Sequence, residues 1–183
     1  MFSIFEDYTE WINKGKTHPS FELGKNTVIT TDQFNLILDH YVMENESDSE
    51  TVMSIYERIT EKFTVDSWSF DRGFFSKDNK LKLMLKIPKV IMPKKGKKNK
   101  SETEEENSLI FKRLRNKHSA IESNINELEH RGLDRCPDRG YEKFKRYVAL
   151  AVCAYNLKRI GQKLLDQKLE EKTRPHKTRK IAA

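Results

Sequence analysis

The chain has 183 residues, of which 36% are hydrophobic and 34% are charged, so it is long enough for one ordinary domain with a hydrophobic core, and two full domains are not expected. No apolar run approaches the roughly 20 residues that span a bilayer, and Glu6 and Asp7 stand where a secretory signal would be basic and then apolar. The two cysteines, Cys136 and Cys153, have no Cys or His partners at metal-ligand spacing, which argues against a disulfide framework and a zinc site. We therefore expect a soluble, cytoplasmic protein with two ordinary thiols.

Charge is divided unevenly along the chain. Residues 1–75 contain 6 Lys and Arg against 14 Asp and Glu, a net charge of −8, whereas residues 76–183 contain 29 against 14, a net charge of +15. A basic half joined to an acidic half predicts a surface that faces a polyanion, together with a region that carries carboxylates. Nucleic acid is the obvious polyanion, although Lys-rich tails also serve as solubilising features.

The first predicted elements are a hairpin and a helix. A short apolar stretch opens the chain, and a polar segment over residues 14–19 is expected to be a loop. Residues 26–30 and 34–43 are β-branched, aromatic and aliphatic on either side of a short polar turn, which predicts two antiparallel strands. Apolar residues then recur at spacings of three and four, and Asp48 can cap an amphipathic helix over about residues 49–62.

A strand that ends in an aspartate follows this helix. Residues 65–70 alternate apolar and polar side chains and end abruptly at Asp71 and Gly73, which predicts a strand followed by a turn. Asp71 is therefore expected at the C-terminal tip of a strand. A short helix around residues 77–86 and a buried strand at residues 90–92 come next.

The segment after this strand is strongly basic. Residues 94–100 contain no apolar residue and carry five lysines, so we expect a flexible basic loop. A loop of this composition binds phosphates without reading sequence. Its candidates for such contacts are Lys94, Lys95, Lys97 and Lys98.

Two helices are predicted after the basic loop. Ser101 and Glu104 form a capping-box pattern for a helix that runs towards residue 116. A second helix is expected over residues 117–129, with Glu122 and Asn126 together on one of its faces.

The C-terminal part predicts one long helix and a tail. Apolar residues follow a strict three-four spacing over residues 141–165, which is typical of an amphipathic helix. Residues 170–183 are rich in Lys and Arg, and we expect them to form a disordered basic tail.

Asp71 and Glu122 raise the hypothesis of a metal site. In an α/β sheet, functional residues gather at the carboxyl ends of strands, so a strand-end Asp with a nearby helix-borne Glu suits hard divalent cations. Two such ions support phosphoryl transfer by activating the attacking oxygen and stabilising the leaving one. From spacing alone, a turn role for Asp71 and a solvated helix surface for Glu122 remain the simpler interpretations.

Three segments carry a resemblance to a known family. They are SIFEDYTEWINKGK (Ser3–Lys16), SFDRGFFS (Ser69–Ser76) and HSAIESNINELEHRGLDRCPDRGYEKFKRYVALAVCAYNL (His118–Leu157). In this order they resemble DDE transposases of bacterial insertion sequences, and the third resembles the C-terminal end of these enzymes. The resemblance covers most of the chain up to about residue 165. It implies an RNase H-like α/β domain with a mixed sheet and flanking helices, which agrees with the predicted order of elements.

The resemblance also implies roles for individual residues. Asp71 matches the second catalytic Asp of the family, and Glu122 matches the catalytic Glu of the last domain helix, both as ligands of Mg²⁺ or Mn²⁺. His118 lies one turn before Glu122, where related transposases often have a basic residue. The candidates for holding donor or target DNA near the metals are Arg115, His118, Asn126, His130 and Arg131, although positive residues beside a helix are often plain solvent contacts.

One departure from the family pattern concerns the first strand. An RNase H-like domain takes its first catalytic Asp from that strand. In the transposases that this chain resembles, the strand lies well upstream of the segment that matches Ser3–Lys16. Here that segment begins at Ser3, so we expect the first strand and its Asp to be missing. Asp7, Asp32 and Asp39 are the early substitutes, and loop, turn and strand-surface roles account for them better.

We therefore expect residues 1–169 to form part of a transposase catalytic domain, inactive alone because a two-metal site has lost one ligand. Its expected partners are DNA, a missing N-terminal transposase part and further copies in an active oligomer, in a nucleoid-associated bacterial protein. A non-catalytic DNA-binding or interfering fragment, which uses residues 94–100 and 174–180, is the alternative. A generic RNase H-like nuclease that acts on RNA or hybrids is a third reading.

Overall fold

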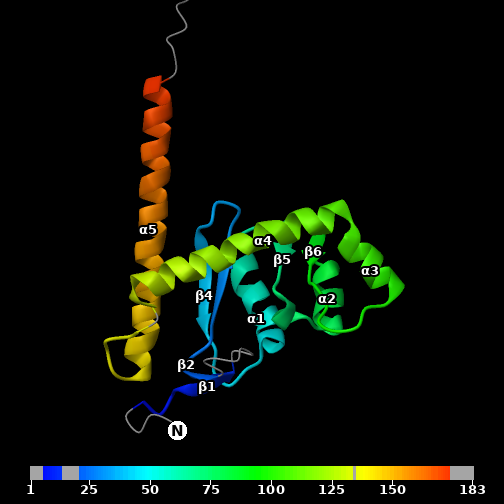
Figure 1. The fold of residues 1–183 in the computed structure, drawn as a ribbon, viewed down its shortest axis with the longest axis horizontal. Coiled ribbons are helices and arrows are strands. Elements are labelled where there is room, and N and C mark those ends of the chain that lie inside the picture. The colour runs from blue at the N-terminus through cyan, green and yellow to red at the C-terminus, as the bar shows by residue number, and fades with distance from the viewer. Residues whose placement is uncertain (1–5, 14–20, 134, 174–183) are drawn as a thin grey trace, which may run out of the picture.

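Figure 1 shows the fold of this computed structural model, which describes residues 6–13, 21–133 and 135–173. Two long helices frame a body of short strands and helices. α4 (Leu109–Leu128) lies across the body, and α5 (Tyr141–Thr173) stands at one end and extends beyond it. The predicted α/β class is confirmed. Among the described residues, no helix is both long and apolar enough to cross a membrane.

Two antiparallel strand pairs come first in the chain. β1 (Glu10–Asn13) pairs with β2 (Phe21–Gly24), and β3 (Thr27–Thr31) pairs with β4 (Ile37–Val42). The second pair confirms the predicted hairpin, whereas the first was not predicted. The opening apolar stretch before Glu6 and the expected loop at residues 14–19 lie outside the described residues.

Asp32 holds the turn between β3 and β4. Its Oδ1 accepts the backbone N–H groups of Phe34 and Leu36, each at 2.8 Å, and Asn35 has a φ of 62°. Aspartate and asparagine favour such turns because Asp accepts nearby backbone N–H groups and Asn tolerates a positive φ. The turn therefore extends to Leu36, and Asp32 has a structural role there.

A helix and a parallel strand pair form the middle of the chain. α1 (Asp48–Thr60) begins one residue earlier than predicted, because Ser47 is its N-cap and Glu50 accepts the Ser47 backbone N–H at 2.7 Å. β5 (Ser67–Ser69) pairs in parallel with β6 (Lys89–Ile91) through a crossover that contains the 3₁₀ turn η1 (Arg72–Phe74) and α2 (Lys77–Met84). The predicted strand, helix and strand are present here with shorter bounds.

The described strands form three two-stranded sheets, not one mixed sheet as we expected. Where β4 faces α5, a side chain of the helix contacts the edge of the strand. The Asn156 side chain accepts the Ile37 backbone N–H at 2.9 Å and donates to the Ile37 C=O at 2.8 Å. A side-chain amide thus takes the place of a neighbouring strand at this position.

Two apolar clusters make up most of the core. One contains Val52 of α1, Leu83 of α2 and Val90 of β6, and the other contains Ile37 of β4 and Tyr155 of α5. α4 contacts β5, β6 and α5, so it links the two clusters. Phe111 near its start and Leu128 at its end are 2% and 1% exposed, so a buried side chain anchors α4 near each end.

The helices after the basic loop differ from prediction. The capping box consists of Asn99 and Glu102, not Ser101 and Glu104, so α3 spans Lys100–Asn107. Ser108, with ψ at 146°, ends α3 and caps α4, whose 20 residues run unbroken through the predicted boundary at residue 116. A single serine that accepts the N–H of Phe111 sets this bend, because it both ends one helix and starts the next.

The long C-terminal helix is confirmed and is longer than predicted. α5 reaches Thr173, so the expected disordered tail is wrong for residues 170–173, and residues 174–183 lie outside the described part. Between α4 and α5, η2 (Glu129–Leu133) ends at a glycine turn, where Gly132 has a φ of 102° and its C=O accepts the Tyr147 hydroxyl at 2.9 Å. This turn fixes the start of α5 against the end of α4.

Asn156→Ala should lower the free energy of unfolding by about 1–3 kcal/mol, because it leaves the Ile37 backbone groups without their partner in a partly buried place. Urea denaturation measures this change. Gln162→Ala, on an exposed part of the same helix, is the matched control and should change stability by less than about 0.5 kcal/mol. Equal effects of the two variants would show that the Asn156 contact contributes nothing specific.

Candidate active site and nucleic-acid surface

Asp71 lies just beyond the end of β5, close to where the sequence placed it. It is the N-cap of η1, and its Oδ1 accepts the Arg72 backbone N–H at 2.7 Å. The side chain is exposed, and one carboxylate oxygen remains for other partners. The strand-end position thus presents a carboxylate to solvent.

Glu122 lies in the second half of α4, on an exposed part of the helix. His118 precedes it by one turn and is half-buried. Burial lowers the pKa of the His118 imidazole below its ordinary value, while the charges of Asp71 and Glu122 and a hydrogen bond with the Ser69 backbone act in the opposite direction. A strand-end carboxylate and a helix carboxylate therefore act on one imidazole, although 51 positions separate them in the sequence.

Asp48 is a third carboxylate near this place, and sequence reasoning gave it only a capping role. It stands at the first residue of α1, half-buried, and a Cβ on Gly73 would lie 2.2 Å from its Oδ2. Burial, with a further contribution from the charge of Asp71, raises the pKa of the Asp48 carboxyl. Only a residue without a side chain fits between α1 and η1 here, and Gly73 in SFDRGF was the one sequence signal of this close approach.

The donor set around His118 fits a hard divalent cation in part. Carboxylate oxygens are the ligands that Mg²⁺ prefers, and no described ion pair engages Asp71 or Glu122. Over the ranges that the structure describes, no group of three or more acidic, His or Cys side chains has the arrangement of a metal site. Two carboxylates are thus available, and the described residues supply no third ligand in place.

Three of the predicted DNA-contacting residues line one open hollow of about 580 Å³. Asn126, His130 and Arg131 surround it with Ser123 and Glu127. Glu127 accepts a hydrogen bond from Arg131 and forms an ion pair with Lys158 of α5. The hydrogen bonds from Lys158, the larger contribution, and from Arg131 outweigh burial and lower the pKa of the Glu127 carboxyl. The lining of the hollow begins at Ser123, next to Glu122 in sequence, and includes Asn126 one turn after Glu122, so the hollow continues the same helix surface.

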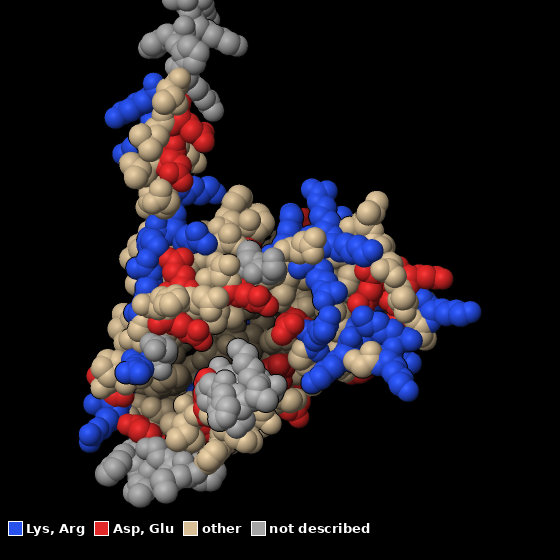
Figure 2. Space-filling model, in the orientation of Figure 1, with Lys and Arg blue, Asp and Glu red and all other residues tan. Residues whose placement is uncertain are grey.

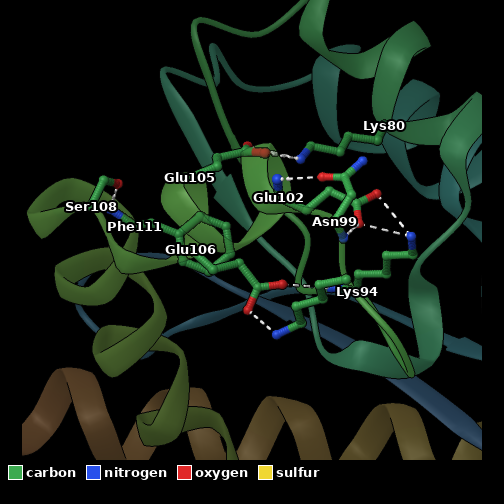
Figure 3. A network of polar contacts seen from close by, with 9 residues as sticks. Lys80, Lys94, Asn99, Glu102, Glu105, Glu106, Ser108 and Phe111 are labelled. Carbon is green, nitrogen blue, oxygen red and sulfur yellow. Dashed lines mark hydrogen bonds and ion pairs between the residues drawn. The ribbon is translucent and has the colours of Figure 1, made fainter.

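The basic loop is paired with acids, which corrects the expectation of a free flexible segment. Figure 3 shows how α3 is fastened to α2 and to this loop. Lys94 binds Glu102 at 2.8 Å, Lys98 binds Glu106 at 2.5 Å, and Lys80 of α2 binds Glu105 at 2.7 Å. Lys100 belongs to α3. Negative side chains of the chain itself therefore already neutralise two of the four candidate lysines.

Exposed cations remain on the same side of the molecule. Figure 2 shows Lys and Arg gathered over α2, α3 and the first half of α4. The exposed members on the loop and α4 that no described ion pair engages are Lys95, Lys97, Lys112, Arg113, Arg115 and Lys117. Arg115 lies near Glu106. Burial alone would raise the pKa of the Glu106 carboxyl, but the hydrogen bonds from Lys98 and Lys94 and the charges of Lys98 and Arg115 outweigh burial and lower that pKa. Arg115 is thus on the α3 side and away from the hollow that the other candidates line.

The pKa of Asp48 should lie above 3.8 in the folded protein and should fall towards that value in Asp71→Asn, because the second cause of its shift is removed. Carboxyl NMR titration measures it, and Glu122→Gln should leave it unchanged. Because the folded pKa is raised, the stability that Asp48 contributes falls as pH rises from the unfolded pKa through the folded one. If the pKa of Asp48 is the same in Asp71→Asn as in the wild type, the two carboxylates do not interact.

Comparison with known proteins gives a family. The model of the transposase DDE domain matches residues 4–157, which include the described β-strands, α1 to α4 and the first half of α5. No curated protein and no solved structure matches the chain. The match covers well over half of the sequence and contains Asp71, His118 and Glu122, so the chain belongs to the DDE transposase domain family.

Proposed function

We propose that the chain carries the second and third catalytic carboxylates, Asp71 and Glu122, of a Mg²⁺-dependent transposase of an insertion sequence. The observation that carries this proposal is the packing of α4 against β5, which brings Asp71, just beyond β5, and Glu122 of α4 near the same half-buried His118. Membership of the family supports DNA as the substrate. The reaction class is cleavage at element ends followed by transfer of 3′-hydroxyls to target DNA.

We infer an RNase H-like topology for the domain. The order of hairpin β3–β4, helix α1, strand β5, helix α2, strand β6 and long helix α4 supports it, as does the parallel pairing of β5 with β6. In such a domain a further strand joins the hairpin to the parallel pair and carries the first catalytic Asp. We propose that another segment or polypeptide supplies this strand and carboxylate, and that the chain alone is inactive.

Asp71 and Glu122 would hold the divalent ion, which supplies charge stabilisation and an activated oxygen for phosphoryl transfer. Burial lowers the pKa of the His118 imidazole, which disfavours the charged form of the ring, while the charges of Asp71 and Glu122 act on it in the opposite direction. Asn126, His130 and Arg131 continue along α4 and the turn that follows, and there they bind the DNA backbone. The protein thus orients the phosphate beside the carboxylates.

The metal proposal is testable without activity. Mn²⁺ should broaden the His118 imidazole NMR signals, and Mg²⁺ should lower the His118 pKa, because a cation beside the ring disfavours the imidazolium. Asp71→Asn and Glu122→Gln should each remove both effects, while each keeps the size of the side chain. Glu104→Gln, an exposed glutamate of α3, is the matched control and should leave them in place.

Broadening that survives both site variants would show that the ion binds elsewhere and would refute the assignment. In a protein complemented with the missing strand, Asp71→Ala or Glu122→Ala should also abolish Mg²⁺- or Mn²⁺-dependent cleavage, because two ions can no longer be held in line with the scissile phosphate. Cleavage that persists in both alanine variants would also refute the assignment.

A non-catalytic DNA-binding function is the second candidate, and the exposed Lys95 and Lys97 of the basic loop favour it. Binding by phosphate contacts alone weakens steeply with salt and is indifferent to metal removal.

On this reading, Lys95→Ala with Lys97→Ala should weaken DNA binding and lower the slope of log K against log salt by about 2. Lys94→Ala with Lys98→Ala is the matched comparison and should act less, because Glu102 and Glu106 already pair with these lysines. Fluorescence anisotropy with and without EDTA measures both. Equal effects of the two pairs would show that the ion pairs do not limit the lysines.

A further inference from the structure

α3 is held on the protein by charge and not by hydrophobic packing. Its eight residues, KSETEEEN, include no apolar side chain, and none of them is buried. Four glutamates and one lysine give the helix a net charge of −3. A helix of this length is marginal in water on its own, so its polar contacts with the rest of the chain keep it in place.

One face of α3 pairs with lysines of α2 and of the basic loop. Its glutamates at positions i, i+3 and i+4 share that face, and each accepts from a different lysine. The pairs are Glu102 with Lys94, Glu105 with Lys80 and Glu106 with Lys98 (Figure 3). The three lysine side chains keep 30%, 17% and 27% of their surface exposed. Such partly exposed pairs are screened by salt, so they hold α3 only weakly.

The charged face of α3 lies over a hollow of about 250 Å³ and not over a packed core. The three paired glutamates line this hollow, together with Lys80 and Leu81 of α2. Leu81 is 57% exposed, so this part of α2 stays open to solvent beside α3. Neither apolar cluster of the core contains a residue of α3. The helix can therefore leave its position without exposing the core.

The chain leaves helical geometry on both sides of α3. Gly96 in the basic loop has a φ of 86°, and no atom lies within 4 Å of the place where its Cβ would stand. Ser108 at the other end is extended, with a ψ of 146°. The capping box of Asn99 and Glu102 lies within the segment between these two residues. α3 is thus a discrete element that carries its own cap between two non-helical joints.

The three paired lysines belong to the basic surface that Figure 2 shows over α2, α3 and the first half of α4. Lys95 and Lys97 lie between Lys94 and Lys98 in sequence, are exposed, and have no described ion pair. Duplex DNA presents a row of negative phosphates that lysines neutralise. Phosphates that bind to this surface and the glutamates of α3 therefore compete for the same ammonium groups.

We propose that α3 is an intramolecular competitor of DNA: it covers Lys80, Lys94 and Lys98 in the free protein and releases them to backbone phosphates in the complex. The inference rests on the proposed function, because it takes DNA as the partner of the basic surface. It adds a regulatory role for a helix that contributes no residue to the candidate active site. Docking of α3 lowers the apparent affinity for DNA, because only the fraction of molecules with free lysines binds at full strength.

Removal of the three carboxylate charges tests the competition. The triple variant Glu102→Gln, Glu105→Gln, Glu106→Gln keeps the size of the side chains, and glutamine preserves the capping box. It should bind a labelled DNA duplex about tenfold more tightly than the wild type at low salt. The gain should shrink as salt rises, because salt also weakens the ion pairs that dock α3 in the wild type. Fluorescence anisotropy over a range of salt concentrations measures both effects.

The matched control changes the net charge by the same amount elsewhere. It replaces three exposed glutamates that no described ion pair engages, in the variant Glu104→Gln, Glu170→Gln, Glu171→Gln. This variant should bind DNA within about twofold of the wild type, because charges away from the contact are screened. Equal gains in the two triple variants would show that net charge alone acts and would overturn the proposal.

Alanine at the covered lysines gives a reciprocal test. Lys80→Ala, Lys94→Ala and Lys98→Ala together should cost about tenfold more affinity in the glutamine triple variant than in the wild type, where α3 already limits these lysines. Circular dichroism checks that each variant remains folded. Equal losses in the two backgrounds contradict an α3 that competes with DNA.

Hydrogen exchange on the full wild-type chain shows whether α3 leaves its position. Amides of residues 100–107 should exchange faster with the duplex bound than without it, whereas a helix that simply lies under bound DNA exchanges more slowly. Slower or unchanged exchange of α3 in the complex overturns the proposal. If none of these proteins binds DNA, the proposed DNA substrate fails together with the competitor. DNA binding without a gain in the glutamine variant overturns the role of α3 alone.

Discussion

The hydrogen bond between the Tyr155 hydroxyl and the Asn124 amide oxygen is the contact on which the arrangement of the long helices depends. The two residues are each 1% exposed, the bond is 2.7 Å long, and Arg159 adds bonds to both partners. A buried polar pair tolerates little displacement, because an unpaired group there costs about 1–3 kcal/mol. The rotation of α4 about its axis is thereby fixed, and Glu122 and Asn126 take their directions from it.

The elements that a local pattern dictates were predictable from the sequence, and those that depend on distant partners were not. The three-four spacing of α1 and α5 and the alternation before Asp71 correspond to observed elements. At the start of α3, by contrast, Asn99 with Glu102 and Ser101 with Glu104 have the same capping-box spacing. Ion pairs from Lys94 and Lys80 to the glutamates of α3 favour the earlier start of the helix. These pairs cannot be predicted from the local sequence.

The same distinction holds for the candidate site. Asp71 was placed at a strand end and Glu122 on a helix by pattern alone, and their residue types carried the metal hypothesis. The nearness of Asp48 to Asp71 depends on α1 packing against η1, which no spacing reveals. The pairing of Lys94 and Lys98 was equally invisible, because composition counts charges without showing which are already neutralised.

The Asn156 amide on Ile37 also bears on aggregation. Two-stranded sheets have unpaired edges, and an exposed edge is a template on which another chain can add a strand. By filling both backbone groups of Ile37, Asn156 blocks such growth at the start of β4. A strand that joins this edge must displace the amide or begin further along β4, so one side chain controls self-association through this edge.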